Sequence, residues 1–154
     1  MIFRTHIAFA LFIGLLVYNY SNFISSFVFY FLFLFSGAGF PDIDHSKSKF
    51  GRNILSRILG FFSKHRKIFH SIFFGIALSY LFFLYDENAG LGFFLGFTSH
   101  IVLDSLTKQG INFFYPIGKF NVKGFVKSGG RLEAVLFYLF VFANITLLLF
   151  SIFS

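Results

Sequence analysis

The chain has 154 residues, of which 56% are hydrophobic and 30 are phenylalanine, and its mean hydropathy of +0.78 is too apolar for an ordinary soluble domain. We therefore expect one integral membrane domain that covers residues 1–154. The formal net charge of +7 would suit nucleic-acid binding, but no soluble basic segment carries that role, so we expect anionic lipid headgroups and no nucleic acid as partners.

Five apolar stretches are long enough to cross, or nearly cross, a hydrocarbon layer of roughly 30 Å as helices. They cover residues 2–20, 23–40, 71–85, 89–106 and 133–153. No small-residue cleavage site follows the first stretch, so we expect a retained helix and not a signal peptide. The third is short and is expected to lie at a thinner place or to be only partly exposed to lipid. The predicted fold is all-α, a membrane bundle of about five transmembrane helices.

The lysine and arginine residues predict the orientation of this bundle. Arg4 precedes the first helix, seven basic residues lie within 47–67 and five within 108–131. If the chain starts in the cytoplasm and crosses five times, all of them are cytoplasmic, as the positive-inside rule requires. We therefore predict a multi-pass protein of the inner (plasma) membrane, with a cytoplasmic N-terminus and the C-terminus outside.

The second helix is expected to end at Gly39 and Pro41, which disfavour further helix. Asp42 and Asp44 follow in a loop, where alternate side chains point the same way. Two neighbouring carboxylates favour a metal ion or an arginine as their partner. The same acidic loop, which ends at His45, is equally suited to cap a following helix.

Residues 46–63 repeat large apolar side chains at every fourth position, with arginine elsewhere on the helical wheel. This pattern predicts an amphipathic helix in the plane of the cytoplasmic headgroups. His65, Arg66 and His70 then lead into the third helix. They suit metal ligation and the binding of an anion, but alone they would read as a basic interfacial anchor.

His100 and Asp104 are four residues apart in the fourth helix, so they share a face and suit one metal ion. An ion pair of Asp104 with Lys108 is the alternative. The following segment, 108–131, is broken by glycines and Pro116, and a small hairpin is predicted over 120–127. His6 and Glu133 stand near the starts of the first and last helices, where an interfacial histidine and a helix-dipole carboxylate are equally ordinary.

All five histidines and four of the six acidic residues thus fall near the predicted cytoplasmic ends of the helices. Ionisable residues are costly in a membrane protein, so their convergence at one depth indicates a site. The set is His6, Asp42, Asp44, His45, His65, His70, His100, Asp104 and Glu133. Because cysteine is absent, only nitrogen and oxygen atoms are available as ligands, which favours zinc and then manganese among divalent metals.

In order and spacing, several blocks of the chain resemble the LexA-regulated, inner-membrane, metal-dependent hydrolase family. The blocks are Thr5-His6, Pro41 to His45, His65-Arg66 with His70-Ser71, Gly96 to His100, and Leu103 to Thr107 with Gly110 and Pro116. The resemblance runs from about residue 5 to residue 134 and includes Glu133. Members often read His-Arg-Gly-x-Thr-His-Ser where this chain has Lys67 and Phe69 at the third and fifth places.

A fainter similarity exists to the helical metal site of zinc-dependent phospholipase C and related single-strand nucleases, whose ligands come in the same order. That order is matched by His6, Asp44, His70, His100 and Asp104. The later His-x-x-x-Glu ligands of those enzymes have no counterpart here, which argues against a full three-metal centre.

We therefore expect a membrane-bound metal-dependent hydrolase that acts on a phospholipid, a lipid-linked phosphate or another ester at the cytoplasmic surface. The expected ligands of a first cation are Asp44, His70, His100 and Asp104, with Asp42 and His6 for a second. The expected catalytic residues are His45 or His65, which would move protons, and Arg66, which would hold the substrate anion. The alternative is a non-enzymatic membrane protein that binds a structural or transported divalent cation.

Overall fold

The structure is a computed structural model that describes residues 1–44, 69–118 and 120–153, with residues 43 and 44 described by their backbone alone. The predicted amphipathic helix over 46–63 lies outside the described residues, as do His45, His65 and Arg66.

The described chain is all-helical, as predicted, and contains no named strand. Its elements are α1 (Phe3–Tyr20), α2 (Phe27–Gly39), the short 3₁₀ helix η1 (Phe40–Asp44), α4 (Ile72–Tyr85), α5 (Glu87–Ser105) and α6 (Arg131–Phe153). Each of the five α-helices lies within a few residues of a predicted apolar stretch. Apolar runs bounded by glycine, proline or acidic residues were therefore sufficient to locate them.

Two of these helices, α1 and α6, are long and apolar enough to cross a membrane, whereas α2 and α4 are shorter apolar helices. Helix α5 is long enough with 19 residues, but it carries three glycines and several polar side chains. Five separate crossings are thus not established, and five transmembrane helices remains a prediction.

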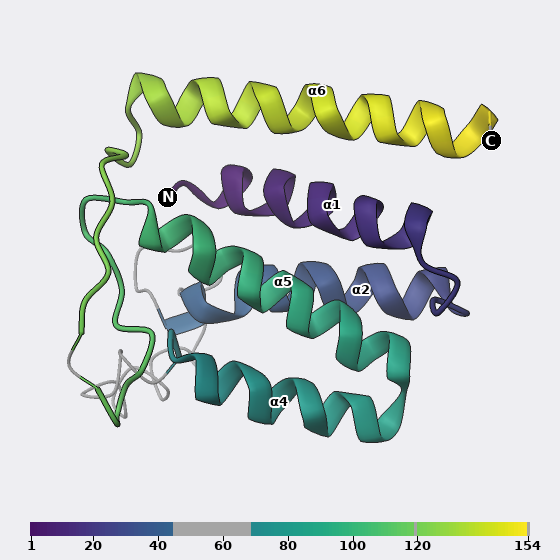
Figure 1. Cartoon of the computed structure of the whole chain (residues 1–154), viewed down its shortest axis with the longest axis horizontal. Coiled ribbons are helices and arrows are strands. Elements are labelled where there is room, and N and C mark those ends of the chain that lie inside the picture. Colours follow the sequence, from purple (N-terminus) through teal and green to yellow (C-terminus); the bar gives the residue numbers. More distant parts are fainter. Residues whose placement is uncertain (45–68, 119, 154) are drawn as a thin grey trace.

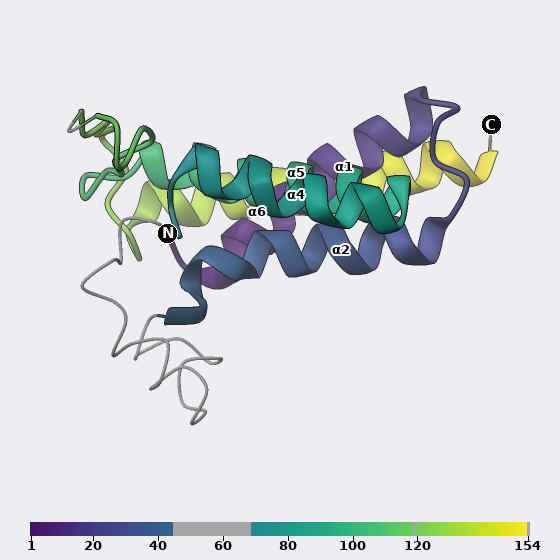
Figure 2. The same cartoon turned by 90° about the horizontal axis from the view of Figure 1, so that it is seen from below.

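The helices lie side by side, and α5 contacts α1, α2 and α4, while α6 packs against α1 (Figure 1). The starts of α1, α4 and α6 and the ends of α2 and α5 lie at one end of the bundle, and the view turned by 90° agrees (Figure 2). The predicted up-and-down course of the chain therefore holds. It brings the polar ends of all five helices to one place.

Glycines allow α2 and α5 to cross with their backbones almost in contact. A Cβ atom at Gly96 would lie 1.9 Å from the carbonyl oxygen of Leu34, and one at Gly92 would lie 2.2 Å from that of Tyr30. Gly92 and Gly96 form a G-x-x-x-G pair, the spacing that permits close helix packing in membranes. This crossing fixes the end of α2 against the end of α5.

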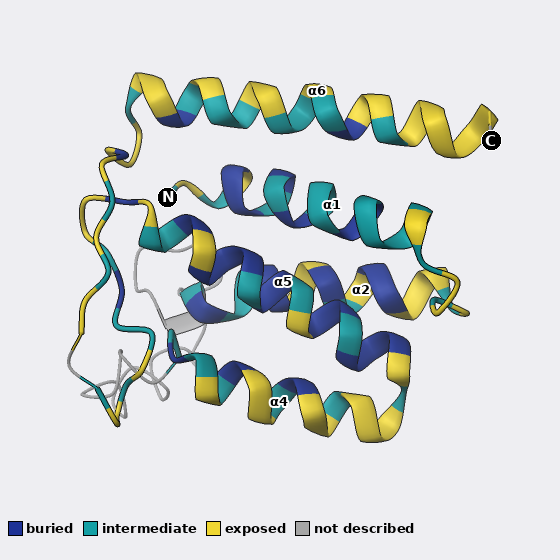
Figure 3. Ribbon diagram, viewed as in Figure 1, coloured by how far each residue is buried: buried dark blue, intermediate teal, exposed yellow. Residues whose placement is uncertain are grey.

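Many large apolar residues are exposed, and exposed residues recur along α4 and α6 in the ribbon coloured by burial (Figure 3). Phe142 and Tyr138 on α6, for example, are 71% and 68% exposed. An apolar surface of this extent suits contact with lipid and not with water. The buried residues instead line α5 and the helix faces turned toward it.

The hairpin predicted over 120–127 does not form by itself. This segment pairs with the stretch after α5: the backbones of Ile111 and Val122 exchange hydrogen bonds of 3.0 and 2.9 Å, and Lys108 N donates to Val126 O at 3.0 Å. Gly124 permits the close approach, because a Cβ there would lie 2.2 Å from Leu106 O. A partner more than ten residues away gave no signal in the local pattern on which the prediction rested.

Candidate metal site

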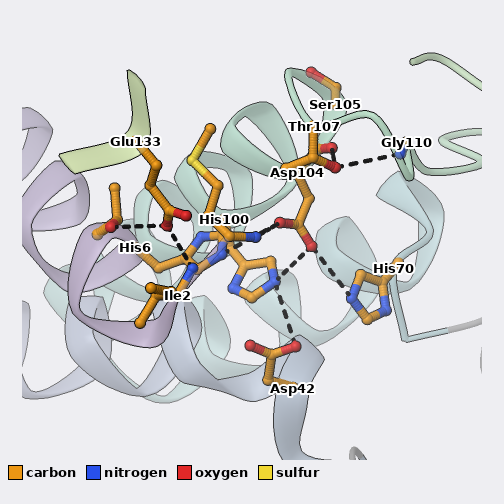
Figure 4. A network of polar contacts seen from close by, with 12 residues as sticks. Ile2, His6, Asp42, His70, His100, Asp104, Ser105, Thr107, Gly110 and Glu133 are labelled. Atoms are coloured by element: carbon orange, nitrogen blue, oxygen red, sulfur yellow. Dashed lines mark hydrogen bonds and ion pairs between the residues drawn. The ribbon is translucent and has the colours of Figure 1, made fainter. Parts of the chain in front are cut away.

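The site is built around His100 and Asp104, which stand one turn apart near the end of α5 and point the same way (Figure 4). Nε2 of His100 lies 3.4 Å from Oδ2 of Asp104. The predicted sharing of one face is therefore present. The alternative, an ion pair of Asp104 with Lys108, is not found among the ion pairs of the described residues.

His100 is held in one orientation by the backbone of α2. Its Nδ1 lies 2.8 Å from the carbonyl oxygen of Ala38, and a carbonyl can only accept, so Nδ1 carries the proton. The other nitrogen, Nε2, then has a free lone pair. It is buried, makes no hydrogen bond within the described part of the chain and faces the carboxylates. This is the arrangement in which metal-binding histidines are found, with the second ring nitrogen bonded to a carbonyl.

His6 comes from the first turns of α1 and stacks on His100, with ring centroids 3.9 Å apart and planes inclined by 10°. Its side chain is 1% exposed, and neither ring nitrogen makes a hydrogen bond to a described residue. Nε2 of His6 lies 3.3 Å from Oδ1 of Asp104. A buried imidazole with no hydrogen-bond partner is costly, so these nitrogens fit a role as ligands.

Asp104 is shared between several neighbours. Its Oδ1 faces His6 and also accepts from the α-amino group of Met1 at 2.6 Å. Its Oδ2 faces His100 and, at 3.9 Å, Nε2 of His70. His70 reaches the site from the turn before α4. That turn is fixed to the loop after α5, because Ile72 N donates to Phe113 O at 3.0 Å.

Asp42 completes the cluster from η1, with Oδ1 at 3.9 Å from Nε2 of His100. The acidic segment forms a 3₁₀ turn and not the predicted extended loop, so Asp42 and Asp44 do not follow the two-residue alternation on which the prediction relied. Two groups of side chains each have ligand atoms within 4.8 Å of one another. They are His6, His100 and Asp104, and Asp42, His70 and His100.

The structure thus brings together five of the nine residues predicted for the site: His6, Asp42, His70, His100 and Asp104. The side chain of Asp44 lies outside the described residues, as do His45, His65 and Arg66. Three imidazole rings and two carboxylates are a donor set that suits zinc or manganese.

Glu133 has a different task from that of a ligand. One carboxylate oxygen accepts from the backbone N–H of Ile2 and, at 3.0 Å, from the hydroxyl of Thr5, and the other accepts from the N–H of Gly129. The residue is 2% exposed. It ties the start of α6 to the start of α1 and so positions the turn that carries His6. Of the two predictions for Glu133, a carboxylate that stabilises the start of a helix is closer to this role than a member of the metal site.

Two contributors to the site were missed in the sequence. The role of the Ala38 carbonyl cannot be recognised from the residue type, because every residue has a backbone carbonyl. Thr5 was noted only as part of the Thr5-His6 block, and its bond to Glu133 was not predicted, because the two residues are 128 positions apart.

Comparison with known proteins gives the family. The model of the YdjM inner membrane protein family matches residues 1–153. "Uncharacterized protein YvsG" of Bacillus subtilis is 37% identical over 84 residues, 52% of each chain. "Uncharacterized protein ORF4" of Methanothermobacter thermautotrophicus is 37% identical over 73 residues, 46% of this chain and 31% of that protein. The chain therefore spans about half the length of the first relative and about a third of the second.

No solved structure matches the chain significantly. The family match confirms the predicted inner-membrane family, while hydrolysis and regulation by LexA stay predictions. Because the matched residues include nearly the whole sequence, the chain belongs to the YdjM inner membrane protein family.

Proposed function

We propose that the cluster at the end of α5 binds a divalent cation, zinc by preference and manganese as the second choice, in a membrane-bound hydrolase. The observation that carries this proposal is the pair of buried imidazoles, His6 and His100, whose unbonded nitrogens face two carboxylates. Outside a metal site, such nitrogens would be expected to have hydrogen-bond partners.

The geometry supports one cation for each chain. His100 has a single free nitrogen, since Nδ1 is bonded to Ala38 O, so it serves only one of the two ligand groups. One group joins Asp42, His70 and His100, and Oδ2 of Asp104 lies beside it, 3.4 Å from Nε2 of His100 and 3.9 Å from Nε2 of His70. The other group joins His6, His100 and Asp104, so His6 is the alternative ligand on the side of the other Asp104 oxygen, which lies 3.3 Å from its Nε2. Asp44 remains a further candidate ligand.

A divalent cation held there would polarise an ester or phosphoryl oxygen and make water a better nucleophile near neutral pH. Residues of the chain would hold the cation, transfer protons and bind the substrate anion. Asp104 and His100 would hold the centre at the end of α5, the end that is predicted to be cytoplasmic. His45 or His65 would take up and release protons, and Arg66 would bind the substrate anion through its planar guanidinium.

The substrate class follows from the position of the cluster. It lies at the end of the bundle where the thirteen basic residues are expected to meet anionic headgroups, in a family of inner-membrane proteins. A phospholipid, a lipid-linked phosphate or another membrane ester would bring its polar group to this depth. We therefore propose hydrolysis of such a bond at the cytoplasmic surface.

The test is turnover by the purified protein in detergent micelles that contain phospholipid or a lipid-linked pyrophosphate. Addition of zinc or manganese should give release of product, and His100→Ala should abolish it. Glu87→Gln is the matched control, because Glu87 is an exposed acid at the opposite end of α5 and should leave turnover unchanged. Equal rates in His100→Ala and wild type would reject the assignment.

A structural cation is the second candidate, and the complete burial of His100 favours it. Such an ion would raise the melting temperature without any turnover. Transport is less well supported, because two polar side chains of the opposite halves already have hydrogen-bond partners. Ser79 Oγ donates to Gly75 O at 2.7 Å, and Asn88 Nδ2 donates to Ser25 Oγ at 3.1 Å.

A further inference from the structure

An open groove with a volume of about 540 Å³ runs between α1 and α6 on the outer surface of the bundle. Its walls are almost entirely apolar and include Ile7, Leu11, Phe137, Val141 and Leu148. The two helices run in the same direction (Figure 1). From Phe137 to Leu148 the groove follows α6 for roughly 16 Å at the helical rise of 1.5 Å per residue. It therefore has the form of a slot along the helix axes.

One end of the groove carries a positive charge. The guanidinium carbon of Arg4 lies 4.9 Å from the ring centroid of Phe137, and both residues line the groove. Arg4 is exposed, and no carboxylate among the described residues pairs with it. Glu133, the acid at the start of α6, is buried and bonded to other donors. The charge of Arg4 is thus available to an anion.

The groove is separate from the candidate metal site. Arg4 and His6 are two positions apart on α1, which turns their side chains about 200° from one another around the helix. The floor of the groove is fixed by Asn144, whose Nδ2 donates to Ala8 O at 2.9 Å and so joins α6 to α1. A ligand in the groove therefore has no need to contact the histidine cluster.

We propose that this groove binds an anionic phospholipid, with an acyl chain between α1 and α6 and the headgroup phosphate on Arg4. A cation at headgroup depth above an apolar slot is complementary to such a molecule in both charge and polarity. A helix from a second copy fits less well. Close helix contacts in membranes use small residues, whereas Val141, Ile145 and Leu148 are large. The proposal is independent of any metal or hydrolytic activity.

The experiment uses tryptophan fluorescence in liposomes, because the chain contains no tryptophan. Phe137→Trp places a single reporter under Arg4 and keeps an aromatic face for the guanidinium. Brominated phosphatidylglycerol and brominated phosphatidylcholine are compared as quenchers in phosphatidylcholine vesicles. We expect phosphatidylglycerol to bind about fivefold more strongly, the selectivity that one basic residue near the surface provides.

Adding Arg4→Gln should reduce this preference to about one, whereas Arg131→Gln, an exposed arginine at the same end of the bundle, should keep it. An unchanged preference in Arg4→Gln, or no preference in the parent, would overturn the proposal. Absence of quenching by either lipid would also overturn it, because the groove would then be covered by protein, such as a second copy.

A second measurement tests the acyl-chain half of the groove. Val141→Phe fills the slot, and Val135→Phe makes the same change at an exposed position of α6 outside it. Native mass spectrometry of the detergent-purified full chain should find co-purified anionic lipid on the Val135→Phe variant and severalfold less on Val141→Phe. Equal lipid on both variants, at equal melting temperatures, would contradict binding in the slot.

Discussion

His100 belongs to both candidate ligand groups. The backbone of α2 fixes its proton on Nδ1, and its position one turn before Asp104 sets the second donor. The contact of this pair could be predicted from the sequence, since residues four apart in a helix lie on the same face. The carbonyl that selects the tautomer could not, because it belongs to Ala38 on another helix.

Glu133 gives a prediction at the same scale, because its carboxylate is used for structure. Glu133→Gln keeps the size of the side chain but removes the charge and turns an N–H donor toward other donors. We expect the free energy of unfolding to fall by about 2 kcal/mol, as for a lost hydrogen bond to a charged group. Thermal denaturation measures this loss. When both proteins are fully folded, the metal content of Glu133→Gln should equal that of wild type. Loss of the metal at unaltered stability would instead make Glu133 a ligand.

At the scale of helices, the crossing of α2 and α5 decides whether the site forms. It brings Ala38 and η1 against His100, and it depends on glycines whose Cβ positions are occupied by backbone of the other helix. The G-x-x-x-G spacing is visible in the sequence, but which helix it faces is not. Partner choice depends on the shape of both surfaces and not on the pattern of one.

Gly96→Ala tests this crossing. The new methyl group would lie 1.9 Å from Leu34 O, so the helices must separate, and we expect a loss of stability of about 3 kcal/mol or more. Gly39→Ala is the matched control, since its nearest neighbour would be the ring of Phe3 at 3.5 Å, an ordinary contact. Melting temperatures in detergent measure both. Similar values for the two variants would contradict the close crossing.

For the whole molecule, the orientation in the membrane is the open prediction. The chain has no cysteine, so single cysteines can be introduced and labelled with a membrane-impermeant maleimide. We expect Asn22→Cys and Glu87→Cys to react on intact spheroplasts and Ser128→Cys to react only after lysis, because basic segments stay in the cytoplasm. Labelling of Ser128→Cys from outside would reverse the orientation and move the site to the other surface.

The apolar runs in the sequence predicted where the α-helices lie. Because successive helices run in opposite directions, the sequence also predicted that the acids and histidines at their ends come together. The details that failed were those set by distant partners. Residues 120–127 pair with the stretch after α5 and not with themselves. The acidic segment winds into η1, which brings Asp42 toward His100. Both outcomes depend on packing against α5, which no local pattern records.

The central claim is that His100 and its neighbours bind one divalent cation. Its most direct test is the metal content of the purified protein by mass spectrometry, with wild type, His100→Ala, Asp104→Asn and the control Glu87→Gln loaded and washed alike. We predict one zinc or manganese ion per chain in wild type and in Glu87→Gln, and its loss in the two site variants. Wild type without a retained ion, or equal retention in all four proteins, would contradict the account.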